Sequence, residues 1–173
     1  MPDPTYLDAN PLIYWAAGLA GSAEPRDRAG HDGLEATFAS NDPLALSPIT
    51  LGEFSSGLYK LVRRQGEPHG FFTNDHAIAA EQRVMDLLAS GRLKGRSLGA
   101  RAFEVGMSLV ATATREHGRN VHVWDAIHMY EACRWSRELD RMVTIATADS
   151  DFAAIGDIWP EFTRFVQLKD LSA

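Results

Sequence analysis

Four acidic residues stand where a carboxylate can take part in chemistry, either directly after an apolar segment or near the start of a predicted helix. They are Asp8, Glu53, Asp125 and Asp149. Two carboxylates about 4 Å apart repel by roughly 4 kcal/mol at an effective dielectric constant of about 20. If the four converge in the fold, some must be protonated or a cation must lie between them. Mg²⁺ or Mn²⁺ suits such a group, because these hard cations prefer carboxylate and water oxygens.

Each of these carboxylates also has a local structural role open to it. Asp8 fits an Asx turn, and Glu53 completes a capping-box pattern with Thr50. Asp125 and Asp149 fit helix N-caps, the commoner role for any one such residue. Their joint occurrence favours a shared site. A divalent cation there would lower the pKa of bound water and neutralise charge on a phosphate, which is the chemistry of phosphodiester hydrolysis.

Apolar runs separated by helical patterns predict the fold class. Strands are expected at residues 5–7, 43–47, 142–146 and 165–168. Nearly continuous apolar strands that alternate with helices are typical of a parallel sheet covered on both faces. We therefore expect an α/β three-layer sandwich with a mostly parallel sheet of four or five strands. The active crevice of such a sheet lies beyond the carboxyl ends of its strands, which points to Asp8 and Asp149.

Capping residues and apolar periodicity predict the helices. The first begins with Asn10 as N-cap and Pro11 at the first helical position. Further helices are expected at 33–40 after a loop at 20–30, at 48–62, between a loop at 65–76 and Gly91, at 99–117, and at 124–135. In the fourth of these six helices, Ile78, Met85 and Leu88 recur near one face. In the fifth, Phe103, Met107, Val110 and Thr114 recur at intervals of three and four.

Composition is that of one ordinary globular domain spanning residues 1–173. The chain is 45% apolar and 23% charged, and its single cysteine, Cys133, excludes an intramolecular disulfide. No apolar run approaches the roughly 18 residues of a membrane span, and the first residues do not resemble a signal peptide. We expect a cytoplasmic protein without membrane contact. The six histidines lack zinc-ligand spacing.

Charge is unevenly distributed along a chain whose net charge is −6. Residues 59–101 contain eight basic and four acidic residues, so the remainder is strongly acidic. Our hypothesis is that the densest basic cluster lines the path of an RNA backbone. That cluster is Arg92, Lys94, Arg96 and Arg101.

Two further residue types leave alternatives open. Trp15, Trp124, Trp135 and Trp159 are expected to pack in the core, with stacking on RNA bases as the alternative for any of them. His128 lies one turn after Asp125 and so could approach the acidic site, although packing or exposure is the commoner role.

Four segments together resemble one known family. In order they are 7–13 (LDANPLI), 47–53 (SPITLGE), 125–128 (DAIH) and 147–152 (TADSDF). Their order and rough spacing are similar to those of the PIN-domain ribonucleases, and most of all to the VapC-like toxins of bacterial and archaeal toxin–antitoxin systems. The four segments span nearly the whole chain.

The resemblance implies a PIN-like fold and a Mg²⁺- or Mn²⁺-dependent endoribonuclease. In such an enzyme a metal-activated water would cut single-stranded or loop RNA in line and leave a 5′-phosphate. By match to the motifs, the four acids would bind the metal, and Asn10, Thr147 and Asp151 would be supporting residues. The resemblance further implies a homodimer and a cognate small antitoxin that covers the site and binds DNA.

Other functions remain open from sequence alone. A catalytically silent PIN-like module that binds RNA or protein would not need all four acids, and a stand-alone PIN nuclease would lack an antitoxin. An aspartyl-phosphate phosphatase on an α/β sheet requires two aspartates spaced one residue apart after the first strand. That place reads Asp8-Ala9-Asn10, which is a poor match.

Overall fold

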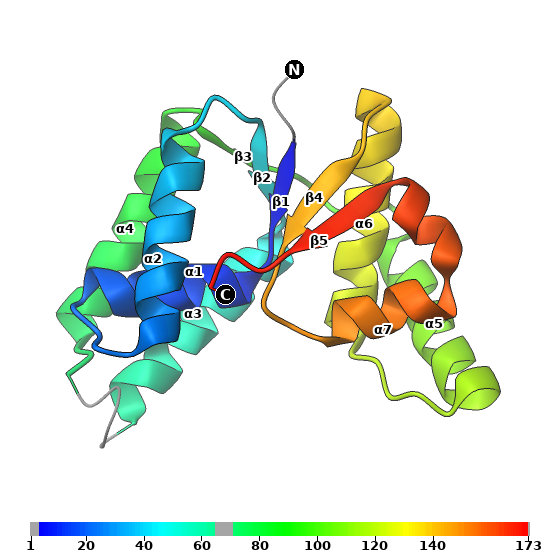
Figure 1. Cartoon of the computed structure of the whole chain (residues 1–173), viewed down its shortest axis with the longest axis horizontal. Coiled ribbons are helices and arrows are strands. Elements are labelled where there is room, and N and C mark those ends of the chain that lie inside the picture. The colour runs from blue at the N-terminus through cyan, green and yellow to red at the C-terminus, as the bar shows by residue number, and fades with distance from the viewer. Residues whose placement is uncertain (1–3, 65–70, 173) are drawn as a thin grey trace.

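A computed structural model describes residues 4–64 and 71–172, and its centre is a five-stranded, all-parallel sheet (Figure 1). The strands are β1 (Thr5–Leu7), β2 (Leu44–Leu46), β3 (Leu93–Gly95), β4 (Val143–Ala146) and β5 (Val166–Lys169). Their order across the sheet is β3-β2-β1-β4-β5. The first strand of the chain is therefore the middle strand of the sheet.

Successive strand residues point to opposite faces of the sheet, and each face builds its own hydrophobic core. Leu7 belongs to the core on one face and Tyr6 to the core on the other. The pairing of Tyr6 with Ala45 on β2 and with Ile145 on β4 keeps small and large apolar side chains in register. Because both faces are covered, the central strands β1, β2 and β4 are largely apolar and buried.

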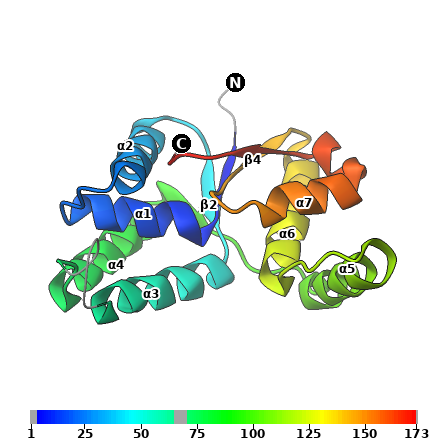
Figure 2. The same cartoon turned by 60° about the horizontal axis from the view of Figure 1, so that its bottom comes forward.

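The helices form two layers, one on each face of the sheet (Figure 2). One layer holds α1 (Ala9–Leu19), α2 (Pro25–Ala39), α3 (Pro48–Arg63) and α4 (Asn74–Ala89). The other holds α5 (Ala102–His117), α6 (Val123–Leu139) and α7 (Asp151–Ile158). This arrangement confirms the predicted α/β three-layer sandwich, consistent with a PIN-like fold.

The strands on the two sides of β1 are filled in opposite directions across the sheet. It moves outward from β1 to β2 and β3, then returns to the other side of β1 for β4 and β5. The carboxyl ends of β1 and β4 therefore flank a topological switch point, the place where open α/β sheets form their crevices. Asp8 follows β1 directly, and Asp149 lies in the loop after β4.

Several predicted boundaries differ from the structure. The loop expected at 20–30 is partly helical, since α2 begins at Pro25, and β3 was not predicted because it holds only one apolar residue. Asp8, not Asn10, is the N-cap of α1. Half of the expected loop at 65–76 lies outside the described residues, and α4 begins within it, at Asn74, with Thr73 as its N-cap.

Most of the apolar residues that recur along α4 and α5 are not the residues that these helices bury. Ile78, Met85, Phe103 and Met107 are all more than half exposed. The buried residues of α5 are Ala102, Gly106 and Ala113. Close packing of α5 on α6 explains this, because a side chain at Gly106 would collide with Ile127. Small residues therefore face the neighbouring helix, and the large apolar ones remain outside.

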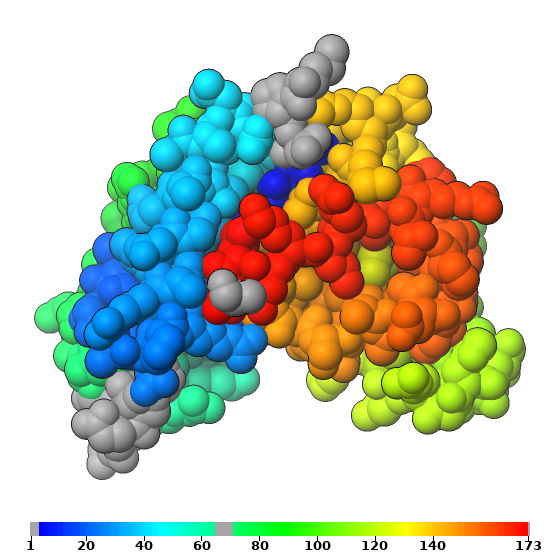
Figure 3. Space-filling model, viewed as in Figure 1, coloured from blue at the N-terminus to red at the C-terminus, as the bar shows by residue number. Residues whose placement is uncertain are grey.

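The end of the described chain crosses between the two layers. After the short 3₁₀ helix Pro160–Arg164 and β5, residues 170–172 lie against α2, and the space-filling view shows this segment between α2 and α7 (Figure 3). Leu171 joins the core of the α1–α4 layer, and the Arg26 Nε atom donates to Ser172 Oγ over 3.3 Å. Among the described residues, no helix combines the length and apolar character that a membrane span requires.

Candidate active site

A cleft of about 790 Å³ lies beyond the carboxyl ends of β1 and β4. The structure brings all four predicted acids to its lining, together with the half-buried Asn10: these are Asp8, Glu53, Asp125 and Asp149. The four acids come from four different places in the chain. Asp8 is the N-cap of α1, Glu53 lies in the second turn of α3, Asp125 in the first turn of α6 and Asp149 in the loop after β4. The cleft is thus assembled from both helical layers.

Asp8 is buried and serves two purposes at once. Its Oδ1 atom accepts the backbone N–H of Ala9 at 2.7 Å, which caps α1. Its Oδ2 atom accepts the hydroxyl of Thr147 at 2.8 Å. Burial raises the pKa of the Asp8 carboxyl, while these hydrogen bonds and the nearby His128 oppose that rise.

Thr147 links the two strand ends that meet at the cleft. Its hydroxyl donates to Asp8 and accepts the backbone N–H of Asp149 at 3.0 Å. Asp149 Oδ1 in turn accepts the backbone N–H of Asp151 at 2.9 Å, so Asp149 orders the turn that leads into α7. Asp151 itself does not line the cleft, although its charge acts on Asp125.

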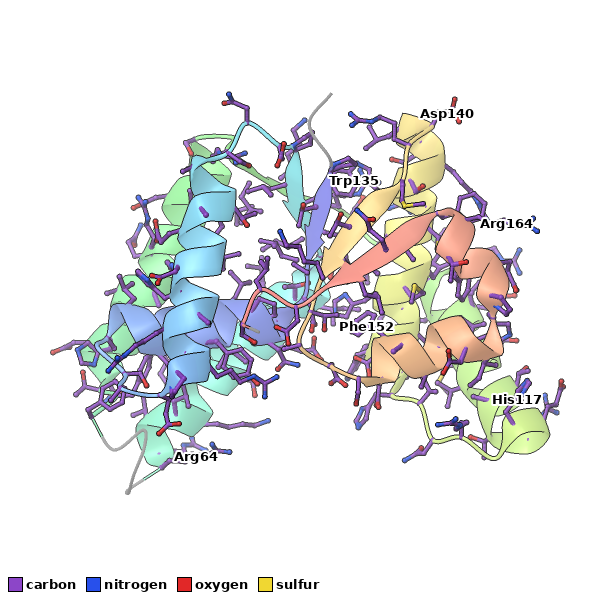
Figure 4. All side chains as sticks on the ribbon, in the orientation of Figure 1. Arg64, His117, Trp135, Asp140, Phe152 and Arg164 are labelled. Carbon is purple, nitrogen blue, oxygen red and sulfur yellow. The ribbon has the colours of Figure 1, made fainter. Side chains whose placement is uncertain are left out.

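Glu53 is held by a buried histidine. Its Oε2 atom lies 3.1 Å from His128 Nε2, and His128 Nδ1 lies 3.1 Å from the Tyr6 hydroxyl. A carboxylate only accepts hydrogen bonds, so Nε2 carries the proton and Nδ1 accepts from Tyr6. Burial raises the pKa of Tyr6 and keeps this hydroxyl a donor. Phe152, labelled in Figure 4, packs on the ring of His128 with centroids 6.4 Å apart.

The carboxyl group of Asp125 lies in an unfavourable electrostatic environment. Burial, followed by the negative charges of Asp149 and Asp8, raises the pKa of its carboxyl to about 8. Without a neutralising partner this group is protonated at neutral pH. It is not the N-cap of α6, a position occupied by His122, but lies in the first turn of that helix.

One group of donor atoms is close enough to share a small cation. Single ligand atoms from Asp8, Glu53 and His128 all lie within 4.8 Å of one another. Asp125 and Asp149 line the same cleft outside that closest group. Oxygen donors predominate in the cleft, which is the ligand type of Mg²⁺ and Mn²⁺.

One face of α3 forms a wall of the cleft along the full length of the helix. The lining residues recur every three or four positions, as one helical stripe requires: Ile49, Gly52, Glu53, Ser56, Gly57, Lys60, Leu61 and, directly after the helix, Arg64. A side chain at Gly57 would collide with Ile13, so this glycine allows α1 and α3 to approach. Figure 4 shows Arg64 at the end of α3 remote from α6.

Distance along α3 separates the acids from the basic residues of the same stripe. Eleven residues at about 1.5 Å each place Arg64 roughly 16 Å along the axis from Glu53. Lys60 and Arg64 are both exposed. The wall therefore passes from negative to positive charge.

The four basic residues of the predicted cluster do not line this cleft. Arg92 donates to the backbone carbonyls of Thr37, Phe38, Ser40 and Asp42 and so completes the C-terminal end of α2. These bonds satisfy carbonyls that the helix itself leaves free.

The other members of the basic cluster lie on β3, directly after β3 and at the N-cap of α5. Arg96 forms an ion pair with Glu138 at 2.6 Å, and its guanidinium lies over the Trp135 ring. Arg101 pairs with Glu104 on the first turn of α5. Lys94 is exposed on the edge strand β3. Three of the four side chains thus have partners within the protein, and an RNA path along this cluster stays a prediction.

Sequence reasoning underestimated three residues that the structure brings to the site. His128 was noted one turn after Asp125, but its contact with Glu53 depends on how α3 and α6 pack. Lys60 and Arg64 could have been found from their spacing of seven and eleven residues after Glu53, which repeats on one helix face.

No model of a known protein family matches this chain, and no curated protein matches it either. Function must therefore be inferred from the chemistry of the cleft itself.

Proposed function

We propose that this protein is a Mg²⁺- or Mn²⁺-dependent endoribonuclease of the PIN-domain type. One observation carries the proposal: four carboxylates from separate elements converge on one cleft at the switch point of a parallel sheet. Burial of Asp125, together with the negative charges of the neighbouring acids, raises the pKa of its carboxyl to about 8. A fold has no structural need for such crowding, whereas a site for a divalent cation does.

The donor set fits a hard divalent cation. Asp8 and Glu53 would hold it in the closest group, with Asp125 and Asp149 reaching it directly or through water, as Mg²⁺ sites commonly allow. When bound, the cation would lower the pKa of a coordinated water and neutralise charge that develops on a phosphate. The supporting roles of Thr147, Asn10 and Asp151 remain part of the proposal.

The chain's own residues position the reactants. Thr147 fixes the carboxylate plane of Asp8, and His128 fixes Glu53. With a cation offsetting the surrounding negative charge, the Asp125 carboxylate, which lines the cleft, would accept a proton from the attacking water. The water oxygen would then bond to phosphorus while the bond to the 3′ oxygen breaks and that oxygen takes up a proton from solvent, which leaves a 5′-phosphate and a 3′-hydroxyl.

Lys60 and Arg64 are the better candidates for the RNA backbone than the cluster predicted from sequence. Both line the same cleft as the acids, and neither forms an ion pair with a carboxylate among the residues that the structure describes. A phosphate some nucleotides from the cut would meet their positive charge. The acidic cleft would then receive only the phosphate that carries the scissile bond.

The proposal extends to the biological setting that the four sequence segments imply. The protein would be the toxin of a toxin–antitoxin pair, acting as a homodimer in the cytoplasm, with a small DNA-binding antitoxin that covers the cleft. The neighbouring reading frame tests this part. A gene for a small DNA-binding protein there is expected, and its absence would favour a stand-alone nuclease.

The nuclease activity is tested with purified protein, single-stranded RNA and either Mg²⁺ or Mn²⁺. Asp8→Asn and Asp125→Asn are each expected to slow cleavage by about 100-fold or more, since the electrostatic contribution of a catalytic cation is several kcal/mol. Chelation of the cation should abolish cleavage. The products should carry 5′-phosphates.

Asp157→Asn is the matched control, because Asp157 is an exposed aspartate of α7 that does not line the cleft. It should cut RNA like the wild type. Absence of metal-dependent cleavage by the wild type, with RNA binding retained, would instead favour a silent binding module. Equal cleavage by Asp8→Asn and the wild type would exclude the acidic cleft as the active site.

A further inference from the structure

Trp124 differs from the other large aromatic residues of the two cores. Trp15 and Trp135 are buried, whereas Trp124 is 37% exposed and lines the acidic cleft. It directly precedes Asp125 at the start of α6. A flat apolar ring is thus held at the rim of the site, next to the carboxyl group of Asp125.

A second exposed ring fixes the orientation of Trp124. Phe103 on α5 meets it edge-on, with ring centroids 5.9 Å apart and planes at 82°. Phe103 is itself 52% exposed, so the pair does not fill a core. An edge-on partner restrains the tryptophan ring while leaving ring surface free.

The cleft therefore presents three kinds of chemistry along its walls. Trp124 contributes an aromatic surface from α6, the carboxylates lie at the strand ends, and Lys60 and Arg64 follow along α3. These match the parts of a nucleic acid strand, which are a base, a phosphate that receives attack and a further phosphate. A bound protein segment has no regular repeat of bases and phosphates, so it would match these three surfaces less directly than a nucleic acid strand does.

We propose that Trp124, oriented by Phe103, is the stacking platform for an unpaired base next to the scissile phosphate. The inference rests on the proposed ribonuclease function and adds a residue that would hold its substrate. Bases in an A-form duplex are stacked on each other, so their faces are not available to a protein ring. The substrate is then RNA that is single-stranded at the cut, and the same sequence in a duplex is not cut.

The test pairs a change in the protein with a change in the RNA. The probe is a single-stranded oligonucleotide that the wild type cuts at one position, and a second version carries an abasic nucleotide beside that position. Stacking of one base on an aromatic ring corresponds to about a 5- to 150-fold change in affinity. Trp124→Ala should lower kcat/KM on the intact probe by that factor.

Non-additivity is the decisive result. The abasic probe should lower kcat/KM for the wild type by a similar factor, and Trp124→Ala should then cause little further loss on that probe. Trp124→Phe should retain most of the activity. Tyr59→Ala is the control, because Tyr59 is an exposed aromatic residue of α3 outside the cleft lining and should cut both probes like the wild type.

Specific results would overturn the inference. Independent, additive losses, or wild-type activity of Trp124→Ala on the intact probe, would show that this ring does not meet the base. If Trp124→Ala left cleavage unchanged but dissociated a dimer in sedimentation analysis, the aromatic rim would be a protein interface. If Trp124→Ala does not fold, Phe103→Ala and the abasic probe on the wild type take its place.

The inference and the proposed function fail in different ways. Metal-dependent cleavage that needs Asp8 but is insensitive to the abasic nucleotide overturns the stacking site alone. No metal-dependent cleavage of any RNA overturns both. Equal cleavage of the single-stranded and duplex forms of the probe overturns the substrate class.

Discussion

The Asp125 carboxyl group illustrates how one residue can have opposite effects on folding and on chemistry. Burial and the surrounding negative charges disfavour its ionised form and raise its pKa to about 8. The unfolded chain would release the same proton near pH 4. Between these values the folded protein holds more protons than the unfolded chain, so the free energy of unfolding falls as the pH rises.

We therefore predict that the metal-free wild type unfolds at a lower temperature at about pH 9 than at about pH 5. Asp125→Asn should weaken this dependence, and the raised pKa of the buried Asp8 should leave a part of it. Thermal unfolding followed by circular dichroism measures both. Asp157→Asn should keep the wild-type dependence, and an identical pH profile for Asp125→Asn and the wild type would contradict the prediction.

His128 gives a second prediction for a single residue. If it holds Glu53 in place for a cation, His128→Leu should weaken Mg²⁺ binding by about 10- to 100-fold, the effect typical of residues that orient metal ligands. Titration calorimetry measures the affinity. Tyr6→Phe, which leaves the ring but removes the donor to Nδ1, should have a smaller effect of the same sign.

The control for that comparison is His117→Leu, since His117 is exposed at the end of α5 and does not line the cleft. It should bind Mg²⁺ with wild-type affinity. The substitution could also lower Mg²⁺ affinity by destabilising the whole fold. Denaturant unfolding of His128→Leu and of the wild type measures that effect. Unchanged Mg²⁺ affinity in a folded His128→Leu protein would show that His128 has only a packing role.

At the scale of helices and strands, local patterns identified most elements but not their contacts. The continuous apolar runs at β1 and β4 predicted these strands because both faces of the sheet are covered. The strand β3 has one buried residue, Leu93, and therefore left no apolar pattern to recognise. Whether Phe103 or Ala113 faced inward depended on how closely α5 approaches α6, which no periodicity within α5 records.

The basic cluster shows the same limit for function. Arg92 and Arg101 were grouped because they lie near each other in sequence. Arg92 is in fact used by the end of α2, where its planar guanidinium reaches four backbone carbonyls. Asp8 and Asp149, in contrast, were identified correctly as neighbours. The carboxyl ends of parallel strands share one edge of the sheet, whichever way the helices pack.

We predict that Arg92→Lys lowers the free energy of unfolding by about 1–3 kcal/mol. An ammonium group cannot bind all four carbonyls, and buried acceptors that are left without a partner cost about that much. Chemical denaturation measures this. RNA affinity should stay within error of the wild type. Lys94→Arg, at an exposed position nearby, is the control and should change neither property. Weaker RNA binding by a stably folded Arg92→Lys protein would show that Arg92 does contact RNA.

At the scale of the whole molecule, the question is how a chain of net charge −6 can approach RNA. The α3 stripe gives an answer, since it separates the carboxylates near Glu53 from the positive charges of Lys60 and Arg64 by roughly two and three helical turns. The polyanion would be attracted at one end of the cleft. The acidic end then admits a phosphate only with a cation present.

The salt dependence of RNA binding tests this division of the cleft. Each phosphate contact with single-stranded RNA contributes a slope of about −0.7 in a plot of log affinity against log salt. The double variant Lys60→Gln, Arg64→Gln should therefore reduce the slope by about 1.4. The matched double variant Lys94→Gln, Arg101→Gln removes the same charge outside the cleft and should leave the slope unchanged, and the reverse ranking would contradict the prediction.

The two cores on opposite faces of the sheet have a mechanical consequence. Asp8 caps α1 and Glu53 lies on α3, both in one layer, whereas Asp125 lies on α6, in the layer that packs on the other face of the sheet. A ligand held by acids of both layers would act as a removable cross-link between the layers. Amide hydrogens of α1 and α6, far apart in sequence, should then slow their exchange together when the cleft is filled.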